Sequence, residues 1–301
     1  MDTPVLLLVF NRLEPAERVL KKIKEARPEK LFISADGPRE SVLGEKEKCE
    51  KLRTTLLQKV DWPCEVQTLF QDQNLGCGKG VSTGITWFFE NVEKGIVLED
   101  DCLPDASFFN YCEVLLDKYQ DDKRIWSIQG VNHQDGMKRG KASYYFSFNN
   151  HVWGWASWSD RWDKYEFMIE EADESIIKKY LANPEVDRYG LHYYKSVLTS
   201  LDRIVTWDYQ WLYTMWRNNG LAVIPNVNLV SNVGHSEGAT HTTESDKFAN
   251  KPTYNIGEIV HPEKIERDLE ADAYDLKKML NKPSLLRRAI RKIKYLLTSD
   301  R

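Results

Sequence analysis

The feature that most constrains the fold is an alternation of apolar runs and amphipathic segments in the first third of the chain. Residues 5–10, 31–35 and 95–98 are largely apolar runs, which is typical of strands buried on both faces of a parallel sheet. Residues 13–23, 43–59 and 81–91 lie around them and carry apolar residues at helical spacing. With an alternating segment at residues 64–70, this order predicts an α/β fold whose doubly wound, mostly parallel sheet is flanked by helices.

Polar residues follow these predicted strands at their carboxyl ends. Asn11-Arg12 follows the first strand, Asp36 follows the second, and three carboxylates follow the apolar run at residues 95–98. Carboxyl ends of parallel strands share one edge of a sheet, and ligands bind beyond that edge. We therefore expect one site at this edge, built from clusters that lie far apart in the sequence.

Glu99-Asp100-Asp101 is the most unusual of these clusters. Three adjacent carboxylates at the end of a buried strand repel one another, and a cation would neutralise them. One interpretation is a divalent metal that holds a phosphate-bearing substrate. The other is a solvated acidic turn, which the triplet alone does not exclude.

A glycine-rich segment at residues 73–80 precedes the third predicted helix. It contains Asn74 and Lys79, and its glycines at alternate positions leave the backbone open to close approach. It matches neither the P-loop nor the dinucleotide-binding pattern. Its backbone N–H groups and Lys79 could meet a diphosphate, or the segment could be a flexible connection between a strand and a helix.

Aromatic residues are concentrated in the second half of the chain. Trp153 and Trp155 flank Gly154, which would allow their rings to lie against a bound sugar, although most tryptophans are core residues. Asp208 lies within Trp207-Asp208-Tyr209-Gln210-Trp211. An aromatic setting disfavours the charged form of a carboxylate and makes it more basic, and a helix N-terminal role is compatible with this.

Overall composition excludes some classes of protein. The net charge of -4 gives no reason to expect nucleic acid as a partner. Five cysteines without a CxxC pair predict reduced thiols rather than a disulfide framework or a structural zinc site, which fits the cytoplasm. No basic leader and no apolar run of membrane-spanning length is present.

Two further segments carry open alternatives. Residues 231–242 form a polar loop with glycines and two histidines, which predicts a lid or part of a metal or phosphate site. Residues 284–297 predict a basic amphipathic helix. That helix would either bind a membrane surface, at the inner face of the cell membrane, or dock on the main domain.

In their order, these motifs resemble the GT-A glycosyltransferases, with the N-acetylglucosaminyltransferase I group and its bacterial relatives closest. The resemblance covers about residues 3 to 243. The matching segments are Phe10-Asn11-Arg12, Ser34-Ala35-Asp36, Lys79 with the helix after it, Leu98-Glu99-Asp100-Asp101, Pro104-Asp105-x-x-Phe108-Phe109, Trp153-Gly154-Trp155, Trp207-Asp208 and Gly238-Ala239-Thr240-His241.

The resemblance implies a GT-A fold, which is Rossmann-like, and a metal-dependent transfer of sugar from a nucleotide-diphosphate sugar, with UDP as the expected nucleotide. Its expected metal is Mn²⁺ or Mg²⁺, held by Asp101 through the diphosphate, with His241 as a further candidate ligand. Asp208 would be the base in an inverting, single-displacement reaction. The nucleotide sugar would contact Asn11, Arg12, Asp36, Asn74, Lys79, Glu99, Asp100 and Thr240.

The acceptor would be a glycan or a lipid-linked sugar, of the kind used in surface polysaccharide synthesis, with Trp153 and Trp155 as its platform. We expect a nucleotide-sugar-binding half at residues 1–132, an acceptor-side half at 133–250 and a C-terminal tail at 251–301. A sugar-phosphate nucleotidyltransferase remains an alternative, although the glycines that it would place after the first strand are missing. A carbohydrate-binding protein would leave the acidic triplet unexplained, and a glycosidase would need paired carboxylates and no nucleotide site.

Overall fold

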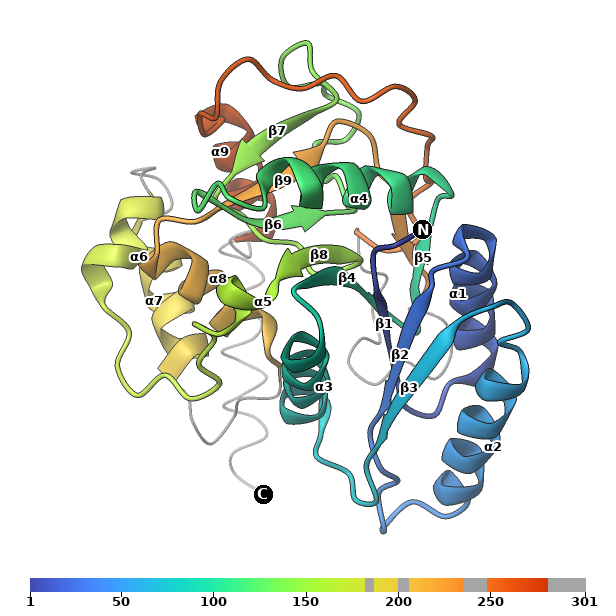
Figure 1. Cartoon of the computed structure of the whole chain (residues 1–301). Coiled ribbons are helices and arrows are strands. Elements are labelled where there is room, and N and C mark those ends of the chain that lie inside the picture. The colour runs from blue at the N-terminus through green and yellow to red at the C-terminus, as the bar shows by residue number, and fades with distance from the viewer. Residues whose placement is uncertain (182–186, 200–205, 235–247, 281–301) are drawn as a thin grey trace, which may run out of the picture.

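The structure is a computed structural model that describes residues 1–181, 187–199, 206–234 and 248–280 (Figure 1). Its centre is an eight-stranded sheet in the order β3-β2-β1-β4-β8-β6-β9-β7. These strands are β1 (Val5–Val9), β2 (Lys30–Ala35), β3 (Glu65–Phe70), β4 (Lys94–Glu99), β6 (Ile125–Gln129), β7 (Tyr144–Ser147), β8 (Trp155–Trp158) and β9 (Leu221–Pro225). The helices are α1 (Leu13–Ala26), α2 (Glu45–Gln58), α3 (Cys77–Asn91), α4 (Ser107–Tyr119), α5 (Ser159–Trp162), α6 (Glu174–Tyr180), α7 (Asp187–Thr199), α8 (Asp208–Arg217) and α9 (Leu269–Met279).

The predicted α/β architecture is confirmed. Strands β3, β2, β1 and β4 are mutually parallel, and β6 and β9 are parallel to each other. Strands β8 and β7 are antiparallel to their neighbours, so the sheet is mixed but mostly parallel. The carboxyl ends of β1, β2 and β4 therefore lie at one edge, as the sequence predicted.

Helices cover both faces of the sheet because the strands are apolar on both sides (Figure 1). In β1, Leu7 packs in one cluster with α1, α2 and α4, whereas Leu6 and Leu8 pack in another with α3 and α8. This alternation follows from the two-residue period of a strand. A third cluster joins α6, α7 and α8 beside the sheet.

The Trp153–Trp158 region differs from its prediction. Four of its residues form β8, which is inserted between β4 and β6 with Trp155 opposite Val97. All four residues of β8 are buried. No polar-apolar alternation marked this strand in the sequence, because both of its faces are covered.

Helix α3 begins earlier than predicted, at Cys77 rather than at Val81. The first helical turn closes through a hydrogen bond of 2.7 Å from the Gly80 nitrogen to the Gly76 oxygen. The glycines of this turn are needed for packing. A Cβ atom on Gly78 would lie 3.1 Å from the Thr206 carbonyl oxygen, and one on Gly80 would lie 3.0 Å from the Asp36 carboxylate.

A second, two-stranded sheet was not predicted. Strand β5 (Cys102–Pro104) directly follows the acidic triplet, and β10 (Val230–Asn232) pairs with it in the antiparallel sense. Asn232 lies opposite Cys102 in this pairing. The pair therefore brings a segment from late in the chain against the triplet.

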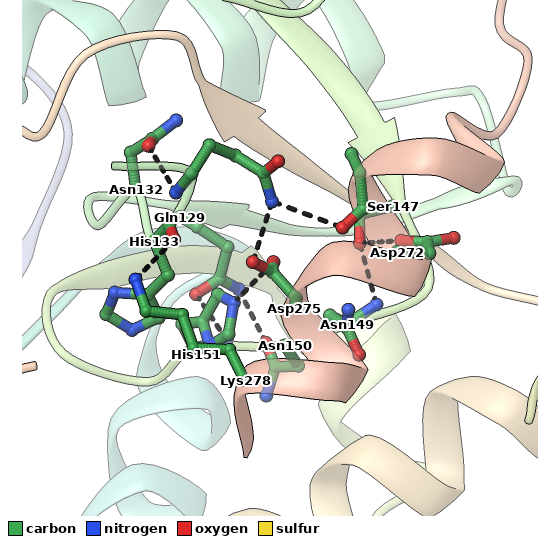
Figure 2. A network of polar contacts seen from close by, with 12 residues as sticks. Gln129, Asn132, His133, Ser147, Asn149, Asn150, His151, Asp272, Asp275 and Lys278 are labelled. Atoms are coloured by element: carbon green, nitrogen blue, oxygen red, sulfur yellow. Dashed lines mark hydrogen bonds and ion pairs between the residues drawn. The ribbon is translucent and has the colours of Figure 1, made fainter. Parts of the chain in front are cut away.

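Helix α9 docks on the main sheet through a buried polar network, which Figure 2 shows. Asp275 on α9 accepts a hydrogen bond of 2.6 Å from Gln134 Nε2 and lies 3.3 Å from His151 Nε2. Asp272, one turn earlier, accepts from Ser147 Oγ at 2.5 Å and forms an ion pair with Arg267. These contacts attach part of the predicted C-terminal tail to the end of β7 and to the loops that contain Gln134 and His151.

Two segments that have helical patterns in the sequence are described only in part or not at all. Helices α6 and α7 lie within residues 170–203, of which residues 182–186 and 200–203 are outside the described residues. The predicted basic helix at residues 284–297 also lies outside them. Across the described ranges, no helix is both long and apolar enough to span a bilayer.

The network under α9 predicts a large loss of stability on truncation of Asp272. Asp272→Ala leaves Arg267 and Ser147 without their buried partner, which should cost roughly 3 kcal/mol of the free energy of unfolding. Glu270→Ala is the matched control, because Glu270 is on the same helix and its side chain is 90% exposed. Its effect should stay below about 1 kcal/mol. Urea unfolding measures both, and equal losses would contradict this account of α9.

Candidate active site

The site is built where the carboxyl ends of β1 and β4 lie side by side. Leu8 of β1 is in register with Glu99 of β4, so the residues that follow each strand must meet. Arg12 Nη2 contacts Asp101 Oδ2 at 2.9 Å and also bonds to Asp100, and Arg12 Nε donates to Asp100 Oδ2 at 3.3 Å. Two of the three predicted carboxylates are therefore held by one predicted arginine.

The negative charge in the site exceeds what Arg12 neutralises. Burial raises the pKa of Glu99 to about 8, and the charges of Asp101, Asp100 and Asp208 act in the same direction. Burial raises the pKa of Asp100 to about 7, and Arg12 only partly opposes this. Desolvation and repulsion between carboxylates therefore raise the pKa values of Glu99 and Asp100 more than the ion pairs with Arg12 lower them. A further cation at this position would favour the ionised carboxylates.

Asp208 belongs to the same cluster, although it lies more than a hundred residues later in the chain. It is the first residue of α8, and Thr206 Oγ1 donates a hydrogen bond to its carboxylate. Burial raises the pKa of Asp208. The structure thus brings the predicted base to the acidic triplet and keeps it more basic than an ordinary aspartate.

Cys77 lies among these acids at the start of α3. The residue is exposed overall, whereas desolvation of its thiol, together with the charges of Glu99, Asp208 and Asp101, raises the pKa of Cys77 to about 12. A thiol that experiences all of these charges must lie between the β4 end and the α8 start. The glycine-rich segment is therefore part of the same site, as the sequence predicted from the strand order.

Asp36 organises the glycine-rich segment. Its carboxylate accepts hydrogen bonds from the backbone nitrogens of Gly37, Leu75 and Gly76 at 2.8, 2.8 and 3.0 Å, and from Asn74 Nδ2 at 3.0 Å. Two predicted site residues, Asp36 and Asn74, therefore contact each other. In this structure Asp36 holds a loop, and its oxygens already have donors.

Asn11 is directed away from the triplet. Its amide donates to Glu45 Oε1 at 2.9 Å, and Glu45 is buried and ion-paired with Arg39. The hydrogen bonds from Arg39 lower the pKa of Glu45 to about 2. Neither Arg39 nor Glu45 was a predicted site residue, and nothing in the local sequence of a charged helix start distinguished them.

Trp155 and Trp153 occupy different environments. Trp155 is 1% exposed and stacks on Trp207 with ring centroids 5.6 Å apart, so the structure places it in the core rather than on a surface that a sugar could reach. Trp153 is partly exposed and lies 6.0 Å from the His133 ring. Trp153 is the member of the pair that can serve as a platform.

Sequence reasoning placed Asn232 and Gly234 in a polar loop with a possible role in a metal or phosphate site, but it singled out neither residue. Asn232 is 5% exposed, and its Nδ2 donates to Asp101 Oδ1 at 3.2 Å while its Oδ1 accepts from the Gly234 nitrogen at 3.0 Å. A Cβ atom on Gly234 would lie 2.1 Å from Asp101 Oδ2. The signal available in the sequence was an Asn-x-Gly segment, which reads only as a turn.

Lys79 is exposed on the first turn of α3 and lines an open groove along that helix. Thr240 and His241, which were predicted to close over the nucleotide and to approach the metal, lie outside the described residues. The described residue that leads to them, Gly234, lies directly against Asp101.

The residues present fit a metal ion only if substrate phosphates and water supply the rest of its ligands. Among the described residues, no three His, Cys, Asp or Glu side chains are arranged to hold a metal by themselves. The raised pKa values of Glu99 and Asp100 nevertheless show that their ionised forms are disfavoured, and a bound divalent cation would favour ionisation. Mg²⁺ and similar cations bind through one or two carboxylates, with substrate phosphates and water completing the shell. Asp101 would be the protein ligand in such a site.

No protein-family profile and no curated protein sequence matches the chain. Similar solved structures include the mannosyltransferase PcManGT from Pyrobaculum calidifontis in complex with GDP-Man and Mn²⁺, at 12% identity over 72% of this chain and 71% of that one, with a TM-score of 0.39. They also include S. aureus TarS, at 14% identity over 58% and 32%, with a TM-score of 0.36.

A third similar structure is a UDP-glucose pyrophosphorylase complexed with UDP-glucose, at 13% identity over 55% of this chain and 79% of that one, with a TM-score of 0.33. Structural similarity at these identities and TM-scores does not establish a function. The resemblance to the N-acetylglucosaminyltransferase I group stays a prediction.

The raised pKa of Glu99 predicts how stability changes with pH. Ionisation is less favourable in the folded state than in the unfolded state, so stability should fall as pH rises from about 4.3, the ordinary glutamate value, toward 8. Glu99→Gln removes this titration, and the fall should be smaller. Glu93→Gln, at an exposed glutamate just before β4, is the control. Thermal unfolding across this pH range in metal-free buffer measures the difference, and parallel curves for Glu99→Gln and the wild type would contradict it.

Proposed function

We propose that the chain is a metal-dependent glycosyltransferase that moves a sugar from a nucleotide-diphosphate sugar to an acceptor hydroxyl. The observation that carries the proposal is the convergence of Glu99, Asp100 and Asp101 with a separate, partly exposed carboxylate, Asp208. The transfer needs a cationic site for a diphosphate and one base for the acceptor, and the two parts of this cluster supply them. A nucleotide based on UDP and an acceptor that is a glycan or a lipid-linked sugar are parts of the same proposal.

Asp208 is proposed as the base. Its pKa is raised by burial, which improves proton abstraction, while the Thr206 hydroxyl fixes one of its oxygens. The acceptor oxygen forms a bond to the anomeric carbon as the bond to the diphosphate breaks. Attack from the face opposite the diphosphate gives inversion. Trp153 supports the acceptor sugar.

The donor is proposed to lie over the β4 end and the start of α3. The N-terminus of α3 and the exposed amino group of Lys79 favour the negative charge of the diphosphate. Glu99 and Asp100 would hold the ribose and the donor sugar. A bound Mn²⁺ or Mg²⁺ would supply Lewis-acid stabilisation of the leaving diphosphate, with Asp101 as its ligand. Asn232 and Gly234 would keep the Asp101 carboxylate in place.

The test is to incubate the protein with a set of sugar nucleotides and Mn²⁺ and to follow release of nucleoside diphosphate. Water can replace the acceptor, so hydrolysis is a sufficient readout. Asp208→Asn should lower the turnover rate by about 10²-fold or more with donor binding unchanged, which is the usual effect of losing a general base. Asp163→Asn, at an exposed aspartate, is the matched control and should retain the wild-type rate.

Asp101→Asn should instead weaken donor binding in the presence of metal. If no sugar nucleotide binds with or without Mn²⁺, the transferase proposal is wrong. Consumption of a nucleoside triphosphate and a sugar phosphate, with release of pyrophosphate, would identify a nucleotidyltransferase in its place.

A further inference from the structure

An open groove of about 490 Å³ runs along the outer face of α3, beside the candidate active site. One wall of the groove is a continuous helical face, because its residues recur at intervals of three and four positions. At a rise of 1.5 Å per residue, this face extends for roughly 16 Å. Its residues are Lys79, Ser82, Thr83, Thr86, Trp87 and Glu90.

The rest of the lining is apolar and aromatic and consists of Leu69, Tyr165 and Phe167. The Tyr165 ring stacks on Trp162 with centroids 4.3 Å apart and planes 10° apart. Its hydroxyl donates to the Trp207 carbonyl oxygen at 3.2 Å. Stacking and this hydrogen bond hold the ring firmly, so the groove is preformed.

The groove is continuous with the site that contains the proposed base. A Cβ atom on Gly78 would lie 3.3 Å from Phe167 Cε2 and 3.1 Å from the Thr206 carbonyl oxygen. Thr206 in turn donates to Asp208. One end of the groove, at Phe167 and Lys79, therefore adjoins the reacting groups, and the other end, at Glu90, leads away from them.

The lining residues match the chemistry of a sugar chain. Aromatic faces, here Trp87, Tyr165 and Phe167, pack against the apolar faces of sugar rings, and hydroxyls bond their polar edges. Ser82 Oγ donates to the Lys79 carbonyl oxygen, and Thr86 Oγ1 accepts from Trp162 Nε1, so each hydroxyl keeps further hydrogen-bonding capacity.

Charge and polarity argue against other occupants. Lys79 and Glu90 carry opposite charges at the two ends of the face, which favours an uncharged occupant over a second phosphate group. A lipid tail would leave the remaining hydrogen-bonding capacity of the hydroxyls in between unused. An oligosaccharide satisfies both conditions.

We propose that this groove binds the oligosaccharide chain of the acceptor, next to the sugar that carries the reacting hydroxyl. The role of the oligosaccharide as an acceptor rests on the proposed transferase function, whereas its binding in the groove does not. The substrate class that follows is an oligosaccharide or a polymer rather than a single sugar on a lipid.

The test measures binding of a panel of neutral monosaccharides and oligosaccharides to the full chain by saturation-transfer NMR, without nucleotide. Longer oligosaccharides should bind more tightly than monosaccharides. Thr83→Trp fills the groove and should weaken oligosaccharide binding by about tenfold or more. Thr54→Trp places the same side chain at an exposed threonine on α2, and should bind as the wild type does. Phe167→Ala, which removes one ring, is a second variant in case Thr83→Trp does not fold.

The groove assignment is overturned if no oligosaccharide of the panel binds, or if Thr83→Trp and Phe167→Ala both bind as tightly as the wild type. A short-chain prenyl phosphate is added to the panel as a lipid probe, and the assignment is also overturned if this probe binds in place of the oligosaccharides and Thr83→Trp blocks it. Binding of sugar nucleotides with and without Mn²⁺ is measured in parallel. Absence of this binding would end the transferase proposal, whereas the oligosaccharide data would still decide whether the groove recognises sugar chains.

Discussion

Repulsion among carboxylates at the end of β4 is the constraint on which the rest of the site depends. Glu99 and Asp100 have raised pKa values because the fold buries them beside further acids, and Arg12 compensates only in part. A chain gains no stability from such an arrangement, since buried charges without sufficient partners cost free energy. Retaining it is understandable if a bound cation and a diphosphate complete the charge balance.

Several other features of the fold serve to keep this costly cluster in a fixed geometry. The β5–β10 pair anchors the chain on both sides of Asp101, and the Val233 nitrogen donates to the Asp101 carbonyl oxygen at 2.8 Å. Gly234 leaves room for the carboxylate where any side chain would displace it. The glycines of α3 allow Asp36 from one side and Thr206 from the other to approach the same helical turn. The apolar sheet thus stabilises an edge at which the clustered carboxylates would by themselves destabilise the fold.

The sequence was sufficient for the sheet and its edge, because buried strands and amphipathic helices leave distinct periodicities. It did not reveal β8, since a strand buried on both faces looks like any apolar or aromatic run. For the same reason it could not tell Trp155, which is core, from Trp153, which is partly exposed. Asn232 was not singled out within its predicted loop because its role comes from pairing with β5, more than a hundred residues earlier, and such pairing has no local signature. The aromatic setting of Asp208 indicated a basic carboxylate, whereas its role as the base of a sugar transfer came from the family resemblance.

The central claim is that the acidic site binds a divalent cation tightly only when a diphosphate is bound with it. Titration of Mn²⁺, followed by electron paramagnetic resonance with and without UDP, tests it most directly. We predict weak binding to the protein alone and binding at least about tenfold tighter with UDP, because the described side chains supply too few ligands for a closed site. Equally tight binding without UDP, or no binding in either case, would contradict the account.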